Sequence, residues 1–170
     1  MATILTPIMT SDTLPIGEVV ASSTQAESYP YYAFDQNVEN SWVANSTDSG
    51  EWIQYNFEVG KLVNLIDFYE GGSLPLQISI KASNDGEEWT NLGTFTEFTE
   101  GKTTLDLSGN KTRFLSYRII FDELADGQSA SASRIDLIYN KSEVKYFSQA
   151  NVAYLLTQLS DRIKESHMGE

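Results

Sequence analysis

Residues 76–86 read LQISIKASNDG, and this stretch decides the fold. Every second residue from Leu76 to Ala82 is apolar and most of the intervening residues are polar, so an extended segment here has one apolar face. The Asn-Asp-Gly that follows favours a tight turn, because Asp-Gly readily adopts the positive φ angles that a hairpin requires. The stretch therefore predicts a half-buried β-strand that ends in a turn.

The same alternation recurs in three other segments, at residues 52–57, 114–121 and 135–139. Clusters of Gly, Asn, Asp and Ser separate these segments, and no helix-length periodicity interrupts them between residues 17 and 140. Several short strands linked by turns are typical of a β-sandwich or jelly roll. We therefore predict an all-β domain that spans residues 17–140.

The segments on either side of this domain have different patterns. Residues 1–16 contain Pro7 and Pro15, which interrupt regular pairing, and we expect an extended N-terminal arm there. Residues 141–170 carry an apolar stripe at helical spacing, so this segment is predicted to form an amphipathic helix. The stripe consists of Val152, Leu155, Leu156, Leu159 and Ile163.

An amphipathic stripe has to be covered, either by the sandwich of the same chain or by other copies of the helix. A helix that follows a complete β domain has no helical neighbour in its own chain. We therefore favour self-association through residues 141–170, with a trimer as the expected homo-oligomer.

The composition excludes several classes of function. The 170 residues carry a net charge of −13, from 24 acidic and 11 basic side chains, so a nucleic-acid partner is not expected. No segment is long and apolar enough to enter a membrane, and the start of the chain has no signal-peptide pattern, which predicts synthesis in a host cytoplasm. The chain has no cysteine, which excludes disulfides and thiolate chemistry.

Catalysis is not predicted. The only histidine, His167, lies in a polar tail, so the sequence offers no well-placed histidine to act as the general base of a catalytic triad. The carboxylate pairs at residues 87–88 and 122–123 lie in or beside predicted turns, where acidic side chains are usually solvated. The sequence also contains no phosphate-binding loop or dinucleotide fingerprint. We therefore predict that the chain is not an enzyme.

Four segments resemble the discoidin family, also called the coagulation factor type C or galactose-binding-like family. They read AFDQNVENSW at 33–42, GEWIQYNF at 50–57, ISIKASNDGEEWT at 78–90 and SASRIDLIY at 131–139, in the family's order and spacing. The resemblance implies an eight-stranded jelly-roll sandwich that binds glycans, lipid head groups or proteins and is not catalytic. The tryptophans of these motifs are Trp42, Trp52 and Trp89, and we expect two of the three in the core.

The resemblance also implies a structural calcium. By position, its oxygen ligands are Asp35, Asn37 and Asn40, with a carboxylate from the closing strand supplied by Asp136. The sequence departs from the family pattern at three places, because the expected glycine is Gln36, the expected threonine is Asn40 and the expected glutamate is Arg134. A guanidinium at that place opposes a divalent cation, and pairing of Arg134 with Asp35 is the alternative to calcium.

The family's ligand-binding loops correspond to residues 28–32, 70–74 and 122–131. Aromatic rings there suit the C–H face of a pyranose, while flanking polar groups bond to its hydroxyls. The predicted ligand-binding residues are Tyr29, Tyr31, Tyr32, Tyr69 and Glu70. For each tyrosine, ordinary packing in the sandwich is the competing interpretation.

Residues 146–156, YFSQANVAYLL, resemble segments that end or link domains in bacteriophage tail and fibre proteins. We therefore predict a binding module of a virion, in a tail, baseplate or fibre protein, that mediates adhesion to cell-surface carbohydrate or contacts a neighbouring virion protein. The alternative is a purely structural spacer, cement or scaffold protein that binds no glycan. The two differ in whether the loops are exposed or buried against another chain.

Overall fold

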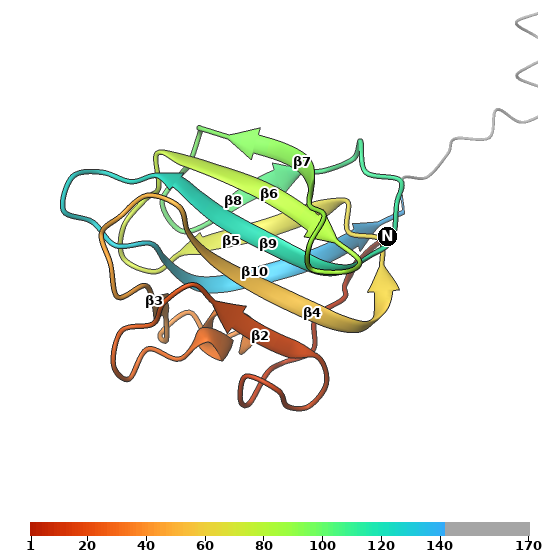
Figure 1. The fold of residues 1–170 in the computed structure, drawn as a ribbon, viewed down its shortest axis with the longest axis horizontal. Helices are drawn as coiled ribbons and strands as arrows, with labels where there is room; N and C mark the ends of the chain where they lie inside the picture. Colours follow the sequence, from red (N-terminus) through yellow and green to blue (C-terminus); the bar gives the residue numbers. More distant parts are fainter. Residues whose placement is uncertain (142–170) are drawn as a thin grey trace, which may run out of the picture. The chain divides into compact units, whose positions relative to one another are not determined.

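The computed structural model describes residues 1–141, which form a sandwich of two antiparallel five-stranded sheets (Figure 1). In the first sheet the order is β1-β10-β5-β8, and β3 also pairs with β10. Its strands are β1 (Ala2–Ile4), β3 (Trp42–Val43), β5 (Leu65–Glu70), β8 (Thr103–Asp106) and β10 (Ser131–Asn140). This architecture confirms the predicted all-β sandwich. The predicted C-terminal helix lies outside the described residues.

The second sheet has the order β2-β4-β9-β6-β7. Its strands are β2 (Glu18–Ala21), β4 (Glu51–Lys61), β6 (Gln77–Ser83), β7 (Thr90–Phe95) and β9 (Phe114–Glu123). The only helical segment among residues 1–141 is η1 (Pro30–Phe34), a short 3-10 helix. No helix of this part of the chain is long and apolar enough to span a bilayer.

The core lies between the two sheets and follows the alternation in the sequence. On β4, Ile53 and Tyr55 are almost fully buried, and on β6 the same holds for Ile78 and Ile80. Leu76 differs from the prediction, because β6 begins at Gln77 with an irregular register and the Leu76 side chain is 51% exposed. The apolar face of this strand therefore begins at Ile78.

The N-terminal arm packs against the sandwich. Its first residues form β1, with Ile4 opposite Ile138 of β10, and the Leu5 N–H continues the ladder by donating to the Leu137 carbonyl. Further along, the side chain of Met9 is buried in the core, and the Met9 N–H donates to the carbonyl of Phe34. The arm therefore completes one edge of the first sheet.

The three tryptophans occupy two different environments, so the expectation of two in the core is wrong. Trp42 is fully buried between the sheets. Trp52 and Trp89 are half-buried and both contact the Arg118 guanidinium, with Cζ at 3.9 Å and 4.0 Å from their ring centroids. Because Trp52 alternates with the buried Ile53, this stack lies on the outer face of the second sheet.

We predict that replacing Arg118 by methionine destabilises the domain by about 1–3 kcal/mol. The change removes two cation–π contacts and leaves the buried Gln54 side chain without the Arg118 Nε donor, which now lies 2.8 Å from Gln54 Oε1. Urea unfolding measures the loss. The exposed Arg113, replaced in the same way, is the matched control, and equal losses in the two variants would show that the stack contributes nothing specific.

Candidate functional site

A shallow hollow opens at one end of the sandwich, where the β5–β6 and β9–β10 loops meet beside β3. Figure 1 shows both loops at the same end of the two sheets. The close approach requires a glycine, because a Cβ built on Gly71 would lie 2.8 Å from the backbone nitrogen of Ala132. The lining residues of this loop hollow are Val43, Gly71, Gly72, Ser73, Gly127, Gln128, Ser129 and Ser131.

The loop hollow is lined by small and neutral groups. Ser73 Oγ donates to the Ser129 carbonyl at 3.3 Å and so ties the two loops together. Gly72 and Gly127 have positive φ angles, and a side chain on either would project into open space. The exposed Gln128 adds an amide donor and acceptor to the backbone groups. Such a surface can hydrogen-bond an uncharged polar ligand at close range.

Two of the three predicted ligand-binding loops form the loop hollow, but none of the five predicted residues lines it. Tyr29, Tyr31 and Tyr32 instead pack together around the start of η1, with ring centroids 4.8 to 5.9 Å apart. Tyr29 is 48% exposed, so this tyrosine triad presents an aromatic surface to solvent. Burial raises the pKa of Tyr31, and a hydrogen bond with Tyr32 adds to that shift. The hydroxyl of Tyr31 is therefore neutral at physiological pH.

Tyr69 and Glu70 lie at the end of β5 and have different partners. The ring of Tyr69 lies under the guanidinium of Arg134, with Cζ 5.2 Å from the ring centroid. One carboxylate oxygen of Glu70, Oε1, accepts a hydrogen bond from the Gly101 N–H at 3.0 Å. The other, Oε2, is the one buried side-chain oxygen among residues 1–141 that has no hydrogen-bond partner. Glu70 thus anchors the β7–β8 loop next to the hollow.

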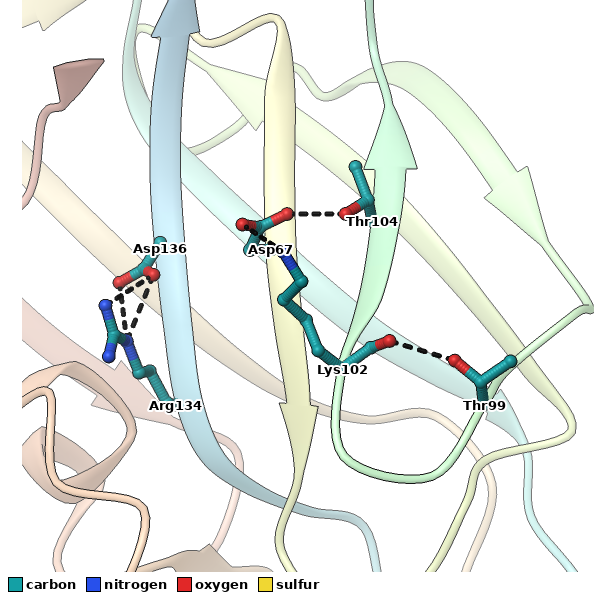
Figure 2. Close-up of polar contacts among 6 residues, drawn as sticks. All are labelled: Asp67, Thr99, Lys102, Thr104, Arg134 and Asp136. Carbon is teal, nitrogen blue, oxygen red and sulfur yellow. Dashed lines mark hydrogen bonds and ion pairs between the residues drawn. The ribbon is translucent and has the colours of Figure 1, made fainter. Parts of the chain in front are cut away.

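The outer face of the first sheet carries both ion pairs found among the described residues (Figure 2). Asp67 and Asp136 are register partners on β5 and β10, so two carboxylates face each other. Lys102 neutralises Asp67 at 3.1 Å, and the hydrogen bond to Asp67 raises the pKa of Lys102. Arg134 pairs with the buried Asp136 at 2.9 Å, and this contact raises the pKa of Arg134. The two cations offset the repulsion between the carboxylates.

The predicted calcium ligands do not fit a calcium ion. Asp35, Asn37 and Asn40 do come together, but they satisfy one another: Asp35 Oδ1 accepts from the Asn37 N–H at 2.8 Å, and Asp35 Oδ2 accepts from Asn40 Nδ2 at 3.0 Å. The fourth ligand, Asp136, is held by both Nε and Nη2 of Arg134. Pairing of Arg134 with Asp35 is therefore wrong.

Calcium prefers six to eight oxygens that include several carboxylates. Here Asp35 is the one carboxylate of the set without a cationic partner. Within residues 1–141, no group of three or more acidic, histidine or cysteine side chains could hold a metal ion. The amide of Asn40 occupies an oxygen that a calcium ion would need, so the 35–40 loop is closed by hydrogen bonds instead.

The described residues thus form a sandwich of two antiparallel sheets with a polar hollow among its end loops. The model of the F5/8 type C domain matches residues 18–133, and the chain belongs to this family. A domain of this kind is not catalytic in itself, as the sequence predicted. No curated protein matches the chain.

Several solved structures share the fold. Chitosan-binding module 1 of a chitosanase/glucanase from Paenibacillus sp. IK-5 is 19% identical, with a TM-score of 0.64 over 73% of this chain and 95% of that one. The family 32 carbohydrate-binding module of Clostridium perfringens NanJ, solved with galactose, is 18% identical, with a TM-score of 0.62 over 72% and 93%. The corresponding module of AlyQ, solved with 4,5-unsaturated mannuronic acid, is 22% identical, with a TM-score of 0.61 over 78% and 99%. At these identities the likeness establishes the fold.

We predict that calcium does not change the stability of the domain. Adding about 1 mM calcium, or EDTA, should move the thermal midpoint by less than about 1 °C, because a ligand stabilises a protein only if the folded state binds it. Asn40→Ala should cost about 1 kcal/mol with or without calcium, because Asp35 loses a hydrogen bond. Asn45→Ala, an exposed asparagine, is the control. A calcium-dependent rise of several degrees in the native chain would contradict the account.

Proposed function

We propose that the domain binds carbohydrate at the loop hollow. The observation that carries the proposal is the loop hollow itself, which is open, polar and uncharged along its lining, in a fold that this chain shares with carbohydrate-binding modules. Three of the similar structures were solved with galactose, with chitotriose or with an unsaturated mannuronic acid. The chemistry required is recognition of hydroxyl groups without catalysis.

The lining of the loop hollow suits that task. Sugar hydroxyls are both donors and acceptors, and the amide of Gln128, the hydroxyls of Ser73 and Ser131 and exposed backbone groups can bond to either kind. Gly72 and Gly127, where a side chain would project into open space, allow a ring to approach the backbone closely. A single open site of this size should bind weakly, because few contacts are made and water is only partly displaced.

The tyrosine triad is the second place at which a sugar ring could stack. The observation that supports this alternative is that Tyr29 is 48% exposed and packs beside two other tyrosine rings. The triad offers ring faces and hydroxyls, whereas the loop hollow offers backbone and amide groups and no aromatic ring. We favour the loop hollow because it is concave and formed by loops from both sheets.

We predict that Gln128→Ala lowers the affinity for a bound sugar at least about fivefold, the loss expected for one uncompensated hydrogen bond. Titration calorimetry with galactose and with a glucosamine trimer measures the affinity. Gln25→Ala, an exposed glutamine outside the loop hollow, is the matched control.

Two outcomes would overturn this assignment. If Tyr29→Ala abolishes binding while Gln128→Ala does not, the sugar binds at the tyrosine triad. If the native chain binds no oligosaccharide on a broad glycan array, the alternative of a structural spacer, cement or scaffold protein is favoured.

We further propose that copies of the chain associate through residues 141–170 and present several weak sites at once in a bacteriophage virion. The apolar stripe of this segment and its resemblance to phage tail and fibre segments support this part, and both lie outside the described residues. Association multiplies weak binding, because the second contact becomes intramolecular. The partners would be a cell-surface glycan or a neighbouring virion protein.

We predict that the full chain is an oligomer, a trimer in the favoured case, and that a chain ending at Asn140 is a folded monomer. Residues 2–141 form one compact unit, so the shortened chain keeps its complete core. Light scattering after gel filtration gives both masses, and circular dichroism checks the fold. Two monomers would disprove association through the C-terminal segment.

A further inference from the structure

A row of polar side chains crosses the outer face of the second sheet. Gln54 on β4 is the register partner of Arg118 on β9, and Arg118 is the register partner of Lys81 on β6. Lys81 in turn faces Asn91 on β7. Register partners in an antiparallel pair project from the same face with Cβ atoms about 5 Å apart. Two cations, Arg118 and Lys81, therefore stand side by side.

Neither of these two cations forms an ion pair with a carboxylate of residues 1–141. Both ion pairs of residues 1–141 lie on the first sheet, and neither includes Arg118 or Lys81. Burial lowers the pKa of Arg118, and no carboxylate opposes that shift. Like charges directly opposite each other on a sheet are destabilising. An anion placed between them would remove this repulsion.

The guanidinium of Arg118 is held in a fixed orientation with part of its donor set unused. Its Cζ lies 3.9 Å from the ring centroid of Trp52 and 4.0 Å from that of Trp89, and Nε donates to Gln54 Oε1. Nη1 and Nη2 have no hydrogen-bond partner within the described part of the chain. Both nitrogens reach solvent, because neither is one of the buried polar atoms that lack a partner. A fixed planar fork that reaches solvent matches the two oxygens of a carboxylate.

We propose that this face binds the carboxylate of an acidic sugar between Arg118 and Lys81. The carboxylate oxygens accept hydrogen bonds from the terminal nitrogens of Arg118 and from the ammonium of Lys81. The exposed parts of the half-buried Trp52 and Trp89 provide apolar surface for the sugar ring. This second site is separate from the loop hollow, whose lining contains none of these residues.

Lys81 is the residue to replace in a test of this site. Arg118 also stabilises the fold through its contacts with Trp52 and Trp89. Replacing it would change both stability and binding, so the two effects could not be separated. The side chain of Lys81 makes no hydrogen bond or ion pair within residues 1–141, and it can be changed without disturbing the stack. Lys61→Gln, which makes the same change of charge at the end of β4, is the matched control.

The experiment titrates the full chain with a galacturonic acid trimer at about 0.15 M ionic strength, where charges beyond about 8 Å are screened. The methyl ester of the same trimer, which has the same rings without the charge, is the comparison ligand. Lys81→Gln should weaken binding of the acid about fivefold, whereas Lys61→Gln should leave it unchanged. The ester should bind at least tenfold more weakly than the acid.

Three results would overturn the proposal. Equal binding of acid and ester would show that the carboxylate is not recognised. Equal affinity of the native chain and the Lys81→Gln variant for the acid would show that Lys81 is not part of the site. Loss of acid binding in Gln128→Ala alone would place the acid in the loop hollow. Failure of neutral sugars to bind would count against the proposed function but would not contradict this second site.

Discussion

The rest of the structure depends on the register between β9, the central strand of the second sheet, and its neighbour β4. Trp52 faces Ile120 and Asn56 faces Ser116, and the strands stay in register between these positions. Because side chains alternate across a strand, a slip of one residue would turn Ile53 and Tyr55 out of the core. The same slip would separate Arg118 from Trp52 and Gln54. One pairing therefore determines both the packed core and the chemistry of the outer face.

The two sheets carry their charges in different ways. On the first sheet, facing carboxylates are each matched by a cation, and the result is a neutralised and largely structural surface (Figure 2). On the second sheet, Arg118 and Lys81 face each other without a carboxylate between them. The loop hollow differs from both, because its lining has no charged side chain. The molecule thus offers an uncharged site at its end and a cationic site on its side.

The sequence predicted the fold well where alternation was regular. Residues 52–57 and 114–121 lie in β4 and β9, and the turn at Asp85 follows β6 as Asp-Gly predicts. Leu76 was misplaced because an irregular register at Gln77 is not visible in a pattern of apolar residues. The tryptophan–arginine stack was missed because it joins residues that are distant in the chain, and cross-strand register cannot be derived from one strand alone.

The candidate site was predicted less well. Two of the predicted loops form the loop hollow, but Glu70, the one predicted residue within them, does not line it, and the lining consists of Val43, glycines, serines and Gln128. One contact was within reach of the sequence. Arg134 and Asp136 are two residues apart on a strand and so share a face, which favours their pairing over a contact between Arg134 and Asp35. The calcium hypothesis depended on leaving Asp136 available.

Backbone amide NMR with added sugar tests the central claim most directly, because it locates binding without any substitution. The claim is that a neutral sugar binds at the loop hollow. Titration with galactose or a glucosamine trimer should shift the amides of residues 71–73 and 127–131, and leave those of residues 29–32 and 116–120 unchanged. Shifts confined to residues 29–32, or no shifts with either sugar, would contradict it.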